Sequence, residues 1–155
     1  MNFAAIDIGS NAMRLLVAEP RMTKNGLVVK KQALVRVPIR LGESVFASGI
    51  ITAEKESILI NALKAYKLLM KTYNVTHYRA VATSAMREAK NAENVLIRVK
   101  NIAEVDIDVI SGKEEAEIIR ETFSGTDLDK SKDYLYIDVG GGSTELSLIR
   151  DGEPI

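Results

Sequence analysis

Residues 6–11 read IDIGSN, and residues 137–142, which lie 131 positions later, read IDVGGG. Each segment ends an apolar run that is typical of a β-strand, and each is followed by a second such run, at residues 13–18 and 144–149. The repeat therefore predicts two β-hairpins of one kind. Each hairpin has an aspartate near the end of its first strand and then a turn rich in small residues.

The two turns have the chemistry of a phosphate site. Backbone N–H groups around glycine can point at an anion without obstruction by a side chain, and hydroxyl and amide groups add further donors. The predicted phosphate-binding residues of the turns are Gly9, Ser10, Asn11, Gly140, Gly141, Gly142, Ser143 and Thr144. The alternative is that each turn merely closes a tight hairpin.

Asp7 and Asp138 precede the two turns. Two carboxylates that face a phosphate chain suit a hard cation such as Mg²⁺, which prefers a few carboxylates together with phosphate oxygens and water. Neither turn is a Walker loop, because the terminal Gly-Lys-Ser/Thr is missing, and neither is a Rossmann fingerprint, because a strand follows instead of a helix.

Composition narrows the class of protein. The 155 residues are 46% hydrophobic and 27% charged, as expected for a globular domain. Lys plus Arg (21) balances Asp plus Glu (21), so the net charge predicts no general attraction to nucleic acid. The absence of cysteine and the single histidine exclude disulfides and thiolate or multi-histidine metal sites. No apolar stretch approaches the roughly 20 residues of a membrane helix and no signal peptide is evident, which predicts a cytoplasmic protein.

Between the hairpins, helical and strand patterns alternate. Strands are expected at residues 27–37, 78–83 and 107–110, with a loop around residues 41–43. Helices are expected from Thr52, over residues 92–103 with Asn91 as the cap, and over residues 112–123. The order β-β-β-α-β-α-β-α predicts an α/β domain with helices on the faces of a mixed sheet. We expect this domain at residues 1–124, a linker at 125–133, and the first hairpin of a second domain at 134–155.

Four segments resemble the exopolyphosphatase and guanosine pentaphosphate phosphohydrolase family in their order and approximate spacing. They are DIGSN at residues 7–11, ATSAMR at 82–87, ISGKEEA at 110–116 and DVGGGSTE at 138–145. The resemblance implies a ribonuclease-H-like fold of the actin, sugar-kinase and heat-shock-chaperone ATPase superfamily, in which two such domains enclose a phosphate cleft. Family members continue beyond the last segment into a second domain, so we expect this sequence to be a truncated version that can fold but turn over little substrate.

The resemblance also implies a reaction: Mg²⁺-dependent removal of terminal phosphoryl groups from inorganic polyphosphate or guanosine pentaphosphate. It makes Glu115 the catalytic base, Glu145 a second acidic residue that positions water or metal, and Arg87 a phosphate clamp. The implied metal ligands are Asp7, Asp138 and Glu145. The family further implies a homodimer for the full-length protein.

The residues alone agree in part. Ser111 and Glu114 have the spacing of a capping box, in which the Glu114 side chain would hydrogen-bond the start of the helix. Glu115 lies about 100° further round the helix and can face a cleft. The alternatives are an exposed first-turn carboxylate for Glu115, an exposed strand residue for Glu145 and a surface ion pair for Arg87.

Two other functions compete with hydrolysis. The same turns could serve a phosphate or alarmone sensor without catalysis, which would bind its ligand regardless of Glu115. The first hairpin taken alone also fits an actin-like ATPase, although the segment at residues 110–116 speaks against it.

Overall fold

The computed structural model describes residues 1–24, 26–123, 129, 131–142, 144–150 and 153–154. The strands are β1 (Asn2–Ile8), β2 (Met13–Thr23), β3 (Gly26–Val37), β4 (Val75–Ala82), β5 (Asp108–Val109), β6 (Tyr134–Val139), β7 (Thr144–Arg150) and β8 (Glu153–Pro154). The helices are α1 (Leu41–Ser48), α2 (Ala53–Thr72), α3 (Ser84–Glu88), α4 (Ala92–Ala103) and α5 (Gly112–Phe123). None of the helices in these ranges is long and apolar enough to cross a membrane.

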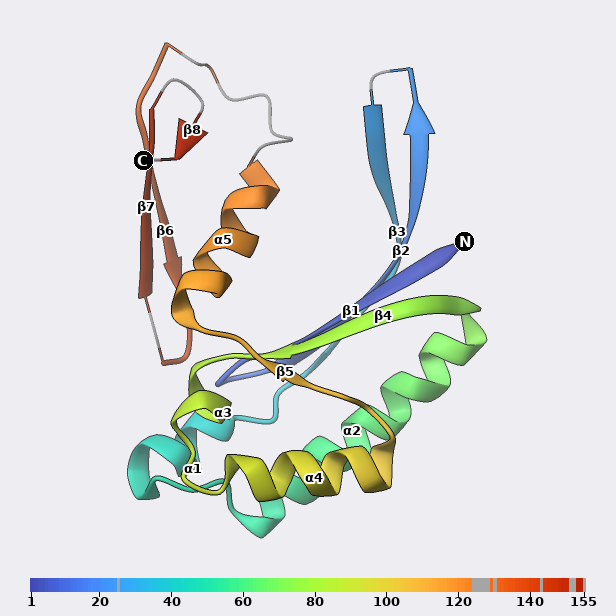
Figure 1. Ribbon diagram of the computed structural model, residues 1–155, viewed down its shortest axis with the longest axis vertical. Helices are drawn as coiled ribbons and strands as arrows, with labels where there is room; N and C mark the ends of the chain where they lie inside the picture. Colours follow the sequence, from blue (N-terminus) through green and yellow to red (C-terminus); the bar gives the residue numbers. More distant parts are fainter. Residues whose placement is uncertain (25, 124–128, 130, 143, 151–152, 155) are drawn as a thin grey trace.

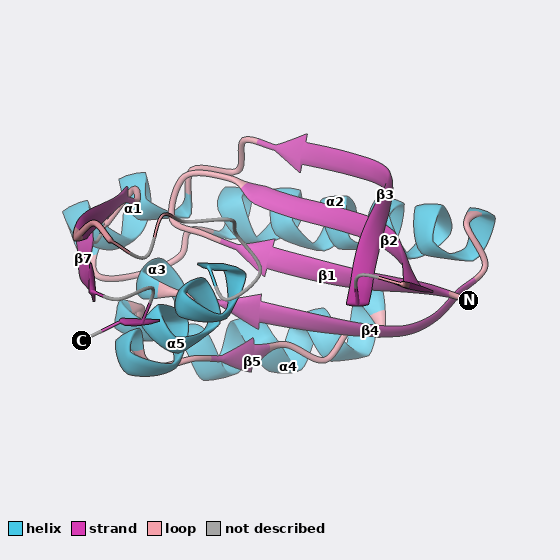
Figure 2. Cartoon of the chain, turned by 90° about the horizontal axis from the view of Figure 1, so that it is seen from above, coloured by secondary structure: helices cyan, strands magenta, loops and turns pink. Residues whose placement is uncertain are grey.

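The first sheet has the order β3-β2-β1-β4-β5. The strands β1, β2 and β3 pair antiparallel, whereas β1–β4 and β4–β5 are parallel. Helices α2 and α4 cover one face of this sheet, and α5 lies on the other face beside a second sheet of order β6-β7-β8 (Figures 1 and 2). This is the mixed sheet with helices on both faces that the sequence predicts. The predicted domain limits stay a prediction, because residues 124–128 and 130 lie outside the described part of the chain.

The core fills the space between the first sheet and helices α2 and α4. Alternate residues of β1 are buried on that face, as expected for a strand whose side chains point to opposite sides. Helix α2 contributes apolar residues at helical spacing. The largest fully buried side chains of this region are Ile6, Ile8, Met13, Leu15, Leu59, Leu63 and Tyr66.

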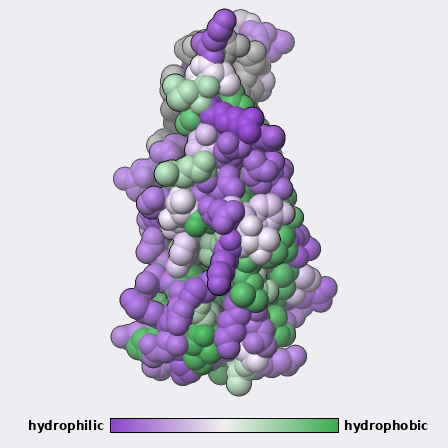
Figure 3. All heavy atoms as spheres, turned by 90° about the vertical axis from the view of Figure 1, so that its right-hand side faces the viewer, coloured by the Kyte–Doolittle hydropathy of each residue, from purple (hydrophilic) through white to green (hydrophobic). Residues whose placement is uncertain are grey.

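The β2–β3 hairpin extends well beyond the neighbouring strands (Figure 1). Its tip exposes Met22, Leu27 and Val29. Figure 3 shows hydrophobic and hydrophilic residues interspersed on this side of the molecule.

Two of the predicted helix caps differ in their hydrogen bonds. Thr52 Oγ1 accepts a bond from the Lys55 N–H at 3.3 Å, so the predicted cap is confirmed. Asn91 occupies the N-cap position of α4, but its side chain makes no capping bond. Instead it bonds both backbone groups of Ile51, with Nδ2 donating to the carbonyl at 2.8 Å and Oδ1 accepting from the N–H at 2.9 Å. Asn91 therefore has the predicted position but not the predicted partner, because its side chain satisfies the backbone N–H and carbonyl of Ile51, just before α2.

Two short helices were not predicted. Helix α1 lies where we expected a loop, and its N-cap residue, Arg40, has a left-handed φ of 51° and no side-chain capping bond. The usual start signal is therefore missing, although Gly49 ends the helix with a φ of 78°, a common stop signal. Helix α3 has five residues, too few for an apolar period to show.

The buried hydroxyl of Tyr66 should make the stability of the fold depend on alkaline pH. Its hydroxyl lies 3.1 Å from the Met13 carbonyl oxygen and 3.0 Å from that of Val35, and the residue is 1% exposed. Burial raises the pKa of Tyr66 to about 12. In the unfolded chain the group ionises near its ordinary pKa of about 10. Folding therefore retains the proton between these values, and stability should fall as pH rises from about 10 to 12.

Tyr66→Phe should lower the free energy of unfolding at pH 7 by about 1 kcal/mol, because the hydrogen bond is lost. The variant should also lose less of its remaining stability than the wild type between neutral pH and pH about 11. Urea unfolding of both proteins at the two pH values measures this. Equal alkaline losses would show that Tyr66 is not the titrating group.

Candidate active site

The predicted site residues gather at one end of the first sheet. Because β1 and β4 are parallel, the segments that follow them leave the same edge, the place where open α/β sheets bind ligands. A cleft of about 630 Å³ lies there, between these segments, helix α5 and the turn after β6. Its lining includes Asp7, Gly9, Ser10, Asn11, Glu115, Gly140 and Gly141.

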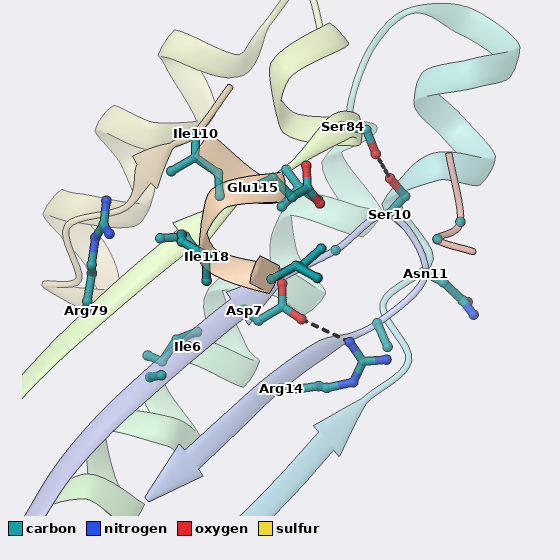
Figure 4. A pocket seen from close by; sticks show the side chains of 18 of the residues that line it. Ile6, Asp7, Ser10, Asn11, Arg14, Arg79, Ser84, Ile110, Glu115 and Ile118 are labelled. Carbon is teal, nitrogen blue, oxygen red and sulfur yellow. Dashed lines mark hydrogen bonds and ion pairs between the residues drawn. The ribbon is translucent and has the colours of Figure 1, made fainter. Parts of the chain in front are cut away.

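The first turn is tied to its neighbours by hydrogen bonds. The Gly9 N–H donates to the Ala12 carbonyl at 3.1 Å and closes the turn. The Ser10 hydroxyl is buried, lies 2.7 Å from Ser84 Oγ and accepts from the Ala85 N–H at 3.1 Å. In this conformation the Ser10 side chain anchors the turn to α3, as Figure 4 shows for Ser84. The Asn11 side chain, by contrast, is exposed.

Glu115 stands in the first helical turn of α5, and its side chain points toward the hairpin turn between β1 and β2 (Figure 4). Its side chain is 17% exposed. Arg87 Nη1 lies 3.6 Å from Glu115 Oε2 and also donates to the Ile110 carbonyl at 2.8 Å. The Ile110 contact holds the guanidinium beside the carboxylate, so α3 and α5 together create a charged pair, of which Glu115 lines the cleft and Arg87 does not.

Glu114 behaves differently from its neighbour. Its backbone N–H donates to Ser111 Oγ at 3.1 Å, which is one half of the predicted capping box. Its side chain does not complete the box but accepts from Arg79 Nη2 at 2.8 Å. Arg79 Nε also donates to Asp108 at 3.2 Å, and hydrogen bonds to Glu114 and then Asp108 raise the pKa of Arg79. Glu115 lines the cleft and Glu114 does not.

The predicted metal ligands are only partly described. Asp7 lines the cleft, and Arg14 Nη1 donates to its Oδ2 at 2.9 Å. Asp7 and Arg14 are direct cross-strand partners in the first hairpin, as Asp138 and Glu145 are in the second. The side chains of Asp138 and Glu145, and all of Ser143, lie outside the described residues. Within the described part of the chain, no three acidic or histidine side chains are grouped as a metal site.

The second turn packs directly on the first. A Cβ atom built on Gly141 would lie 3.2 Å from the Asn11 backbone nitrogen, which is closer than most real Cβ contacts. The described glycines with positive φ are Gly26 and Gly49. Close packing, and not a left-handed backbone, therefore disfavours a side chain at position 141. Thr144 follows as the exposed first residue of β7.

Several cleft residues were missed by sequence reasoning. Arg14 could have been found as the cross-strand partner of Asp7, since both lie in the predicted hairpin. Arg79 and Ser84 line the cleft without a local signal, because they approach it from segments distant in sequence.

The Ppx/GppA phosphatase family matches residues 26–155. The chain belongs to this family. It is 33% identical over 149 residues to the bifunctional 3-dehydroquinate synthase/phosphatase of Fusobacterium nucleatum, covering 94% of this chain and 22% of that protein. It is 29% identical over 158 residues to exopolyphosphatase 1 of Mycobacterium tuberculosis, covering 99% of this chain and 44% of that protein.

Solved structures of Ppx/GppA proteins agree with the fold. The Aquifex aeolicus family member has a TM-score of 0.82 and 31% identity, over 100% of this chain and 49% of that one. An exopolyphosphatase from Cytophaga hutchinsonii has a TM-score of 0.88 and 26% identity, over 100% of this chain and 48% of that one. The predicted family and its ribonuclease-H-like fold are confirmed. The chain spans about half the length of these structures and less than half of the curated relatives.

Proposed function

We propose that this protein removes terminal phosphoryl groups from inorganic polyphosphate, guanosine pentaphosphate or both. The observation that carries the proposal is the position of Glu115: its mostly buried carboxylate lies beside Arg87 and lines the same cleft as both glycine turns. The names of the relatives support a phosphatase, and exopolyphosphatases among them support polyphosphate as the substrate.

In the proposed reaction, the terminal phosphate lies against the backbone N–H groups of Ser10 and Asn11 in the first turn and of the turn at Gly140–Thr144. The Gly9 N–H is not counted among them, because it donates to the Ala12 carbonyl. A water oxygen attacks the phosphorus while Glu115 accepts the water proton. The bridging P–O bond breaks, and its electron pair leaves with the shortened phosphate chain. Arg87 stabilises the equatorial oxygens, since a guanidinium has several donors and the Ile110 carbonyl occupies only part of them. No covalent intermediate with the protein is needed.

Mg²⁺ is the proposed cofactor. Asp7 fits such a cation, because it supplies a carboxylate on the cleft, and Asp138 and Glu145 would add carboxylates from neighbouring positions on β6 and β7. Bound metal would neutralise negative charge on the phosphate oxygens. Arg14 hydrogen-bonds Asp7 and would hold this carboxylate in place at the cleft.

Other properties of the whole protein stay predictions. The zero net charge favours a local phosphate site over general binding to nucleic acid. A homodimer is proposed from the family resemblance, and the cytoplasmic location stays a prediction.

A substrate panel tests the proposed function. Phosphate release from long-chain polyphosphate, guanosine pentaphosphate and ATP should be measured for the longest natural form of the chain, with Mg²⁺ and again with a chelator. We expect release from at least one of the first two substrates, none from ATP, and loss of activity with the chelator. Hydrolysis of ATP alone would favour an actin-like ATPase. Tight binding of the first two without release would favour a sensor.

A further inference from the structure

Phe46 of α1 lies against two glycines: Gly42, one turn earlier in the same helix, and Gly142 of the second turn, which is distant in sequence. A Cβ atom on Gly142 would overlap the Phe46 ring and would lie 2.8 Å from its Cε2 atom. A Cβ atom on Gly42 would lie 2.7 Å from the same carbon. Real Cβ atoms essentially never approach other atoms so closely. Both glycines therefore make room for one aromatic ring.

The same ring lies where the two turns meet. The Cβ position of Gly142 is also 3.1 Å from Ser84 Oγ, and Ser84 is hydrogen-bonded to Ser10 of the first turn. Gly141, the next residue, packs on Ser10 and Asn11. The second turn thus rests on the first turn through Gly141 and on Phe46 and Ser84 through Gly142.

Phe46 is unusual for a packing residue, because it remains 46% exposed. It lines a second cleft of about 670 Å³, which Ser10, Asn11 and Gly141 also line. The ring therefore lines a different cleft beside the turns from the one that Glu115 lines. It supports the turns without occupying the proposed reaction site.

We propose that Phe46 is a positioning residue whose ring sets the separation of the two glycine turns. The inference rests on the proposed function for its consequence, since the turns are the proposed phosphate-binding groups. An aromatic ring is a rigid spacer with few rotatable bonds. Because a displacement of about 1 Å at a reaction site can reduce rate about 10²-fold, a change in this spacer should alter turnover without any lost contact to substrate.

A set of variants at two positions tests this mechanism. Phe46→Ala should lower kcat for phosphate release from long-chain polyphosphate by about 10-fold or more. Gly142→Ala should lower kcat as well, because the added methyl group meets the ring and pushes the second turn away from it. In the Phe46→Ala background, Gly142→Ala should cost little more, since the methyl group then enters vacated space. If Gly142→Ala costs the same factor in both backgrounds, the ring is not the reason for glycine at position 142, and the proposal is wrong.

A distance measurement tests the inference without activity. The chain has no cysteine, so Lys64→Cys on α2 and Leu135→Cys on β6, both at exposed positions, would be the only sites for spin labels. Phe46→Ala should shift or broaden the distance between the labels. Ile97→Ala, which shortens an exposed apolar side chain on α4, should leave that distance unchanged.

An unchanged distance in Phe46→Ala would overturn the positioning role whether or not the protein is active. A changed distance in a protein that releases no phosphate would support the positioning role and contradict the proposed hydrolysis. The two failures are therefore distinguishable.

Discussion

Replacing Glu115 with glutamine should lower kcat for phosphate release by about 10²–10⁴-fold, the usual contribution of a general base. Glutamine preserves the size of the side chain but cannot accept a proton from water. Because the proposed binding groups are backbone N–H groups and Arg87, the KM for polyphosphate should change only a few-fold. Steady-state kinetics of the variant and the wild type, with Mg²⁺ and one polyphosphate length, measure both quantities.

Glu114→Gln is the matched control for this experiment. It makes the same chemical change one residue earlier on α5, where the side chain contacts Arg79 and does not line the cleft. Because exposed ion pairs contribute little to stability, the variant should fold like the wild type. Because Glu114 does not line the cleft, the kcat of the variant should be nearly that of the wild type. If Glu115→Gln were as active as the wild type, Glu115 would not be the base, and a phosphate or alarmone sensor would become the better proposal. If Glu114→Gln lost activity and Glu115→Gln did not, the general base would be Glu114 and not Glu115.

The fold could be predicted where its signals are local. Helix α2 has both a capping threonine and an apolar period over twenty residues, and each hairpin is marked by two apolar runs around a turn of small residues. Helices α1 and α3 lack such signals. Helix α1 begins at an uncapped arginine, and α3 is a single turn fixed by bonds to Ser10, which is 75 positions before Ala85.

The candidate site likewise has some features with local sequence signals and others that depend on contacts distant in sequence. The family resemblance singled out Glu115, and helix geometry around Ser111, which is a local argument, agreed that Glu115 is free to face a cleft. The partner of Glu114 is Arg79, 35 positions earlier on β4, and no sequence period links the two. The contact of Phe46 with Gly142 spans an even longer separation. The chemistry of the turns was visible in the sequence, whereas the packing that brings the turns together depends on the tertiary fold.

The core behind the site supplies the second large expected effect. Leu63→Ala should lower the free energy of unfolding by about 2–5 kcal/mol, the range for truncating a buried leucine. Leu63 is 0% exposed and belongs to the cluster between α2 and the sheet. Leu68→Ala is the matched control on the same helix, because Leu68 is 67% exposed and its truncation should change stability by less than about 0.5 kcal/mol. Urea unfolding measures both values.

Leu63→Ala also separates stability from chemistry. Helix α2, which carries Leu63, lies on one side of the sheet, whereas α5, which carries Glu115, lies on the other (Figures 1 and 2). The variant should therefore lose activity only through its unfolded fraction, and kcat per folded molecule should stay near the wild-type value, unlike that of Glu115→Gln. A large fall in kcat for fully folded Leu63→Ala would mean that core packing sets the geometry of the turns. An equal loss of stability in Leu63→Ala and Leu68→Ala would contradict the placement of the core between α2 and the sheet.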